Sequence, residues 1–232
     1  MRYARGEKGT RNSNPKLRAQ ARMLEGITIT KDGKINVRNL LTVAKSINGE
    51  AGKTARNMII DAGKDESTRE YVIKELVEAL GAGRRSVEAA NILGKIKAVE
   101  AIGALRETAG DNNTWRSSLQ CAAIWALGEL KAKEAIPEII EGLSDPSFMS
   151  VPPDALLKIG EESIPALIEA LSERDSLKRR GAAETLGQFG SDAKEALPAL
   201  KKLTGFWTRI ADKELFNAAE HAINRIEHSG SE

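Results

Sequence analysis

The sequence has few of the residues on which several protein classes depend. It contains one cysteine, which cannot form an internal disulfide. Its longest unbroken apolar run, Cys121 to Leu127, has seven residues, whereas a helix needs roughly 20 to cross a bilayer. The charged N-terminus lacks the apolar segment of a secretory signal. We therefore expect a soluble cytoplasmic protein without a membrane span.

Aromatic residues are also scarce, with four Phe, three Trp and two Tyr among 232 residues. Hydrophobic residues nevertheless make up 41% of the chain, which is enough to build a sizeable core. That core must come from Ala, Leu, Ile and Val, as it does in packed helices. The composition favours an all-α fold over an all-β fold or a wholly disordered chain.

Positive charge is concentrated at the N-terminus. Residues 1–22 hold seven basic residues and one acidic residue, a net charge of +6, whereas the whole chain carries +2 and the remainder therefore −4. Residues 1–16 show no helical or strand period, so we predict a flexible basic arm. Phosphate neutralisation and base stacking would use the cations and the tyrosine of this region; a solvated tail and a contact to an acidic protein are the alternatives. The candidate nucleic-acid-binding residues are Arg2, Tyr3, Arg5, Lys8, Arg11, Lys16, Arg18 and Arg22.

From about residue 51 the chain repeats itself. Four similar segments, LGKIKAVEAIG, LGELKAKEAIP, LLKIGEESIP and LGQFGSDAKEALP, begin at Leu93, Leu127, Leu156 and Leu186. Each segment ends one helix, turns, and opens a second helix. Three of these second helices are predicted to begin at a proline, where the missing amide hydrogen has no partner to lose. These prolines are Pro137, Pro165 and Pro198.

The two helices of each repeat differ in their side chains. The first helices carry pairs of alanines, such as Ala122 and Ala123, which let neighbouring helices approach closely. The second helices carry Ile and Leu at the spacing of one helical face. One pair cannot bury both faces alone, whereas stacked pairs can, so the pattern predicts an α-solenoid.

This pattern of Arg, Ala-Ala, Leu-Gly and Ala-Ile-Pro resembles the short HEAT-like repeats also found in phycobilisome (bilin) lyases. Arg116 and Arg179 match the first-helix arginine, and Asp111, Asp145 and Asp175 the acid of the preceding turn. The resemblance covers residues 51–228 and implies five helical pairs and a terminal helix, followed by a tail at residues 229–232. One unit departs from the pattern, and Pro152-Pro153 is expected to break its first helix early.

Residues 17–50 are predicted to form an N-terminal cap. RNLLTVAKSI has the period of a helix, and ITITKDGKINV precedes it. Two interpretations stay open for the latter segment. One is a degenerate EF-hand whose ligand positions lack the required carboxylates, and the other is a β-hairpin that turns at Asp32-Gly33.

The sequence offers no catalytic, metal or cofactor site that we can assign. GEAGKT lacks the first glycine and the preceding strand of a phosphate loop, so we interpret it as a turn between helices that contains two glycines. Cys121 is expected in the core, without a basic partner to activate it. His221 and His228 share one helix but lack a third metal ligand.

Several aromatic and basic residues beside turns and at helix starts are candidates for binding. Trp125 is expected in the core, whereas Trp115 and Trp207 lie beside turns and are candidate anchors, with packing between repeats as the alternative. Neighbouring turn acids are expected to hold some of the clustered cations. The candidate partner-binding residues are Trp115, Trp207, Arg84, Arg85, Lys178 and Arg180.

We therefore expect a non-catalytic scaffold or adaptor that binds a protein partner through the solenoid, with the basic arm as an electrostatic auxiliary and no cofactor. A nucleic-acid or ribonucleoprotein-binding component is the first alternative. A bilin-lyase-like enzyme or chaperone, implied only by the resemblance, is the second.

Overall fold

A computed structural model describes residues 35–46, 49–81, 86–111, 117–148 and 150–229. These ranges are helical and contain no β-strand. The α-helices are α2 (Val37–Ser46), α3 (Glu50–Lys64), α4 (Glu66–Leu80), α5 (Ser86–Lys95), α6 (Ile102–Ala109), α7 (Ser117–Glu129), α8 (Ile136–Glu141), α9 (Val151–Ile159), α10 (Ile164–Ala170), α11 (Ser176–Phe189), α12 (Leu197–Lys202), α13 (Phe206–Ala211) and α14 (Lys213–His228). Short 3-10 helices are η2 (Val99–Ala101), η4 (Lys133–Ala135), η5 (Gly142–Ser144), η6 (Pro146–Phe148), η7 (Glu161–Ser163) and η8 (Gly190–Ala196).

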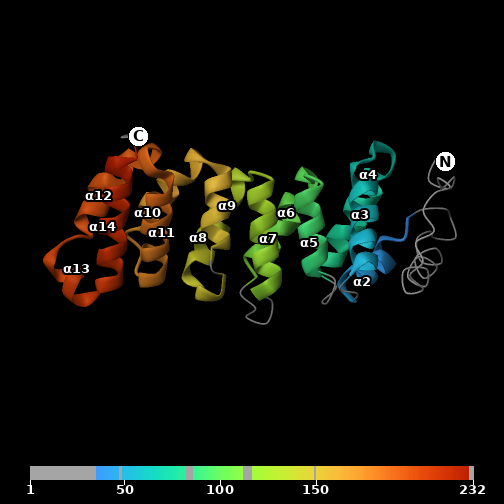
Figure 1. The fold of residues 1–232 in the computed structure, drawn as a ribbon, viewed down its shortest axis with the longest axis horizontal. Helices are drawn as coiled ribbons and strands as arrows, with labels where there is room; N and C mark the ends of the chain where they lie inside the picture. Colours follow the sequence, from blue (N-terminus) through green and yellow to red (C-terminus); the bar gives the residue numbers. More distant parts are fainter. Residues whose placement is uncertain (1–34, 47–48, 82–85, 112–116, 149, 230–232) are drawn as a thin grey trace.

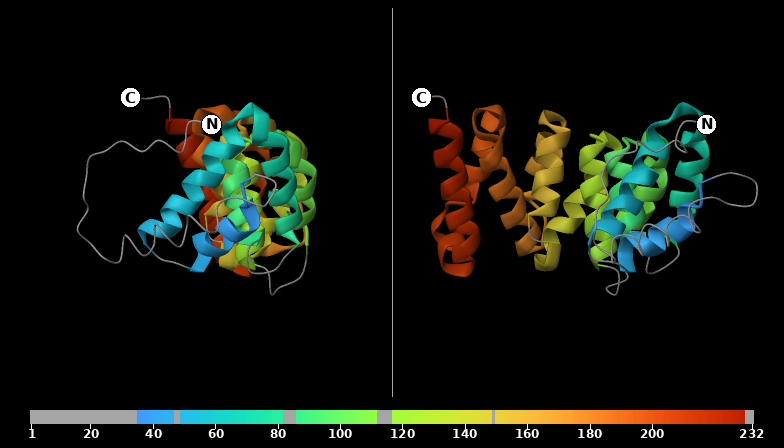
Figure 2. Two further views of the ribbon diagram at one scale, coloured as in Figure 1. Left: turned by 90° about the vertical axis from the view of Figure 1, so that its right-hand side faces the viewer. Right: turned by 45° about the vertical axis from the view of Figure 1, so that its right-hand side comes forward.

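The helices form one elongated row, with α2 near one end and α14 at the other (Figure 1). The first helices of the repeats make one layer, in which α5 packs on α7, α7 on α9, α9 on α11 and α11 on α14. The second helices α6, α8 and α10 also contact one another in order. The view turned by 45° again shows one row of helices, and the view turned by 90° looks along it (Figure 2). The predicted all-α solenoid is confirmed.

The turns inside the repeats follow a common geometry. As predicted, a proline lies in the first turn of α8, α10 and α12. In each of the four repeats, one residue of the turn between the two helices has a positive φ, and this residue is Lys97, Lys131, Gly160 or Gly190. Glycine adopts this backbone conformation without strain, so the last two repeats turn more easily than the first two.

Small residues set the distance between neighbouring first helices. The paired alanines are buried, and Phe148 is the sole buried aromatic residue in the described part of the chain. A Cβ atom at Gly128 would lie 2.7 Å from the Cα atom of Ala155, and one at Gly187 would lie 2.9 Å from the Cα atom of Ala222. The Leu-Gly steps at Gly94, Gly128 and Gly187 therefore let the next first helix approach the backbone.

The departing repeat differs from its prediction. Pro152 and Pro153 do not break α9 but lie in its first turn, where proline is tolerated. The helix is shortened instead, with 9 residues against 13 in α7. Leu157 stands where other repeats have the glycine, and a hollow of about 510 Å³ lies there, lined in part by Leu157 and by Phe189 of α11.

The N-terminal described segment confirms one prediction and corrects another. RNLLTVAKSI forms α2 over Val37–Ser46, as its period predicts. GEAGKT is not a two-glycine turn, because only Gly49 lies outside the helix, at its N-cap, and Gly52 is buried within α3. Glycine takes the φ of 152° at position 49 without strain. The predicted arm and the Asp32-Gly33 segment lie outside the described residues.

Candidate protein-interaction surface

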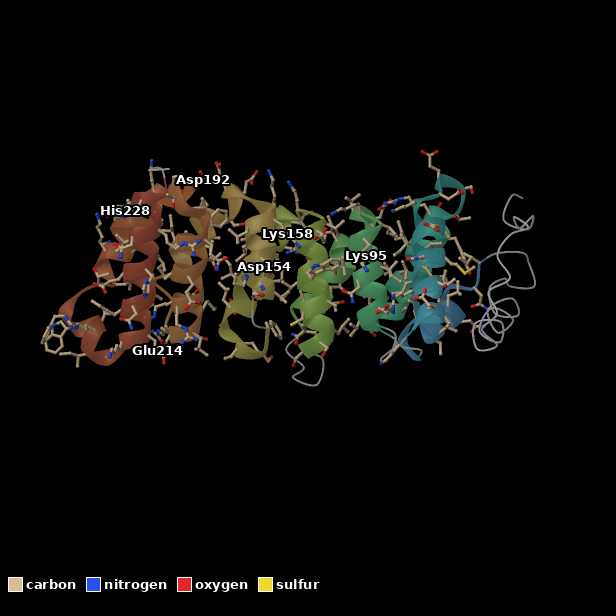
Figure 3. The ribbon with its side chains drawn as sticks, viewed as in Figure 1. Lys95, Asp154, Lys158, Asp192, Glu214 and His228 are labelled. Carbon is tan, nitrogen blue, oxygen red and sulfur yellow. The ribbon has the colours of Figure 1, made fainter. Side chains whose placement is uncertain are left out.

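Ion pairs between consecutive repeats occupy many of the exposed charges on the solenoid. Glu129 of α7 accepts from Lys97 at 2.9 Å and from Lys158 of α9 at 2.6 Å, and thereby links three repeats. Lys158 also lies over the Trp125 ring, beside α7 (Figure 3). The hydrogen bond from Lys158, followed by that from Lys97, lowers the pKa of the Glu129 carboxyl. The carboxylate therefore stays charged in the folded chain.

Arg69 links α4 to the following repeat through hydrogen bonds and an ion pair. Its guanidinium donates to the carbonyl oxygens of Gly63, Ile96 and Lys97 at 3.0–3.1 Å, and it pairs with Glu100 at 3.1 Å. The hydrogen bond from Arg69 lowers the pKa of Glu100. Backbone oxygens that no helix satisfies thus have a charged donor.

The two predicted cations of α11 are also held by neighbouring acids, as expected for clustered charges. Lys178 is 7% exposed and donates to Glu141 at 2.8 Å, and this bond raises the pKa of its ammonium group. Arg180 pairs with Glu214 of α14 and lies 3.8 Å from Glu184. Since Lys178 is buried, we leave it out of the candidate surface. Trp115, Arg84, Arg85 and the arm residues lie outside the described residues.

The largest exposed apolar side chains lie together on α13. Phe206 is 69% exposed, Trp207 79% and Ile210 63%. Helix α13 has no buried residue, and its two aromatic rings meet edge to face at 5.6 Å. We call Phe206, Trp207 and Ile210 the α13 apolar patch. Exposed apolar clusters of this kind mark binding surfaces, because water solvates them poorly.

Sequence reasoning identified Trp207 as a candidate anchor but missed Phe206 and Ile210. It placed Trp207 beside a turn and did not predict that residues 206–211 form the short helix α13. Gly205 before three large apolar residues was the available signal. A helix of six residues is too short to reveal a hydrophobic period, so the sequence alone could not separate it from a turn.

The expected locations of Trp125 and Cys121 are only partly correct. Trp125 is half-buried against the core rather than enclosed by it. Cys121 is also half-buried, and burial raises the pKa of its thiol. A protonated thiol is a weak nucleophile, and this geometry gives Cys121 no activated chemistry.

The histidines and hollows do not assemble a catalytic group in the described ranges. His221 and His228 are both exposed on α14, and the described residues hold no group of three His, Cys, Asp or Glu placed to bind a metal. A hollow of about 470 Å³ between α11 and α14 is lined by Arg180, Glu184, Glu214, His221 and Arg225, among others. In the same described part of the chain, no helix is both long and apolar enough to span a membrane.

Comparison with known proteins identifies the repeats. The family described as PBS lyase HEAT-like repeat matches at residues 119–145, which include α8 and most of α7, and at 178–204, which include α12 and most of α11. A search of curated proteins by sequence finds no match to this chain.

Solved structures with a similar arrangement include two engineered proteins and an enzyme. One engineered protein is 23% identical, with 83% of this chain and 96% of that chain covered and a TM-score of 0.42. The other is 19% identical, with 92% and 68% covered and a TM-score of 0.40. Human deoxyhypusine hydroxylase in complex with glycerol is 17% identical, with 92% and 99% covered and a TM-score of 0.37. These scores support no inference about activity. The chain therefore contains HEAT-like repeats of the PBS lyase type at residues 119–145 and 178–204, within a solenoid of stacked helical pairs.

Proposed function

We propose that this protein is a non-catalytic scaffold or adaptor that binds a protein partner through its solenoid, with the α13 apolar patch as the anchor. The observation that carries the proposal is the exposure of Phe206, Trp207 and Ile210 on a helix without a buried residue. Elsewhere in the described chain, Val99 is the single further large apolar side chain of comparable exposure. The patch thus places three exposed large apolar side chains next to one another, whereas the described repeats expose Val99 alone.

Two further features support a binding role. An elongated solenoid offers a long contact surface, and ion pairs bridge its consecutive repeats. The N-terminal region, with a net charge of +6 over residues 1–22, would add an electrostatic contact that speeds association and makes it sensitive to salt.

Affinity capture from the native cell tests the proposal with three baits: the natural chain, a variant with Phe206→Ala, Trp207→Ala and Ile210→Ala, and a control with Val99→Ala. We expect one stoichiometric protein to be recovered with the natural chain and the control, and about tenfold less of it with the triple variant, because truncated anchors lose most of the contact energy. Equal recovery by all three baits, or no stoichiometric partner, would contradict the proposal.

A further inference from the structure

The chain around α13 leaves positive charge unpaired beside the apolar patch. Lys202 precedes α13, Arg209 lies within it and Lys213 follows it. None of the three has an acidic partner among the described residues; Arg209 instead lies over the Phe216 ring at 5.7 Å. Lys202, Arg209 and Lys213 are all exposed. We call these three residues the cationic rim.

The neighbouring acids are directed to α11 and do not neutralise this rim. Asp212 accepts from Ser176 and from the amide of Leu215, and its carboxylate lies 3.8 Å from Arg179. Glu214 pairs with Arg180, at the end of α14 that follows α13 (Figure 3). Glu220 has no described ion pair, but it lies one helical turn beyond Phe216. The α13 end of this surface therefore carries a surplus of positive charge.

The stacking of the first helices also ends here. Each of α5, α7, α9 and α11 is packed on its far side by the next first helix. Beyond α14 no described first helix follows, and α13 is the element beside it at this end of the row (Figure 1). Phe216 and Ile223 on α14 remain half-buried. An incoming helix would continue the packing that the repeats use among themselves.

We propose that the α13 apolar patch and its cationic rim bind an acidic amphipathic helix of a protein partner. This inference rests on the proposed function and specifies its partner. The apolar face of that helix would cover Phe206, Trp207 and Ile210, while its carboxylates would face Lys202, Arg209 and Lys213. An anionic membrane would meet the same charges but would not use the open end of the helix stack, so the structure favours a protein helix.

Synthetic peptides test this inference on the full chain. The first probe is a fluorescently labelled peptide of about 18 residues with Leu at helical spacing and Glu elsewhere, and the second replaces every Glu by Lys. Fluorescence anisotropy measures both affinities. Sedimentation with phosphatidylcholine vesicles that contain one quarter phosphatidylserine measures membrane binding.

We expect the acidic peptide to bind at least about tenfold more tightly than the basic one, and a salt increase from about 50 to 200 mM to weaken it. Charge reversal of the rim (K202E, R209E and K213E together) should weaken it about tenfold, because three rim pairs are lost. The matched control Lys95→Glu should leave affinity unchanged, since the exposed Lys95 lies on α5, far from α14 (Figure 3).

The inference would be overturned by no binding of the acidic peptide, by equal affinity for both peptides, or by binding to the vesicles alone. Affinity that survives charge reversal of the rim would also overturn it. If the cellular partner depends on the α13 apolar patch but not on the rim, the inference fails and the proposed function stands. If no partner depends on the patch, the proposed function itself fails.

Discussion

The repeats from α5 to α12 and the short helix α13 use the same residue types in opposite ways. In the repeats, apolar side chains are buried against the next repeat, and many cations pair with an acid from a neighbouring one. In α13, the large apolar side chains are exposed, and the cations around it have no acidic partner in the described chain. The comparison shows that the repeats of this solenoid bury most of their apolar side chains and pair many of their cations, and that α13 does neither.

The largest expected effect lies at the close contacts of the repeats. Gly128→Ala would place a methyl group 2.7 Å from the Cα atom of Ala155, and separating the two helices should destabilise the fold by about 3 kcal/mol. Gly103→Ala is the matched control, because nothing lies within 4 Å of its Cβ position in α6, and alanine should there stabilise the helix by about 0.5 kcal/mol. Urea denaturation measures both changes. Equal effects at the two glycines would contradict the described packing.

Loss of the Arg69 guanidinium should have the next largest effect. Arg69→Met removes the guanidinium that donates to three carbonyl oxygens and to Glu100, so we expect a loss of about 2 kcal/mol in the free energy of unfolding. Arg69→Lys keeps the charge but cannot reach all of these acceptors. Its free energy of unfolding should therefore lie between those of the natural chain and of Arg69→Met. A lysine variant as stable as the natural chain would show that charge alone matters at this position.

Glu129 should contribute less, and only while it is ionised. Its pKa is lowered in the folded chain, so its stabilisation is fully present above the ordinary carboxyl pKa and is lost as the pH falls through the lowered value. Glu129→Gln should therefore destabilise the chain by about 1 kcal/mol at pH 7 and have almost no effect under strongly acidic conditions.

Denaturation at both pH values checks this expectation. Glu107→Gln is the control, since Glu107 is exposed and has no ion pair in the described structure. A difference between Glu129→Gln and the natural chain that persists unchanged in acid would show that the ion pairs with the two lysines are not its source.

The smallest effect on stability is expected at α13. Replacement of Phe206, Trp207 and Ile210 by Ala removes exposed groups, so the free energy of unfolding should change by no more than about 0.5 kcal/mol. Thermal or urea unfolding measures it. A loss of several kcal/mol would mean that these side chains serve the fold, and the contrast between α13 and the repeats would disappear.

Much of the fold could be predicted because it repeats. The recurring Leu-Gly steps, the paired alanines and the prolines at Pro137, Pro165 and Pro198 indicated stacked helical pairs, and the structure has them. Pro152 and Pro153 were predicted wrongly because the same residue breaks a helix or begins it, depending on where the helix starts. The residue at which α9 begins depends on packing against other helices, which the local sequence does not reveal.

The candidate surface was less predictable for a physical reason. Whether a cation is free depends on acids about 30 residues away, and only the register of neighbouring repeats brings them together. Lys178 was therefore predicted to bind a partner but is buried beside Glu141. Arg209 was not predicted as a binding residue, yet it has no acidic partner in the described chain. Trp207 was identified from its place beside a turn, and it alone marked α13 in advance.

Site-specific photocrosslinking in the native cell tests binding at α13 most directly. A photoreactive amino acid is placed at position 207 in one bait and at position 99, an exposed apolar site outside α13, in a second. We predict that the bait labelled at position 207 forms a crosslink to one protein in high yield, and that the bait labelled at position 99 does not. The same weak and heterogeneous crosslinks from both positions would contradict a partner-binding role for α13.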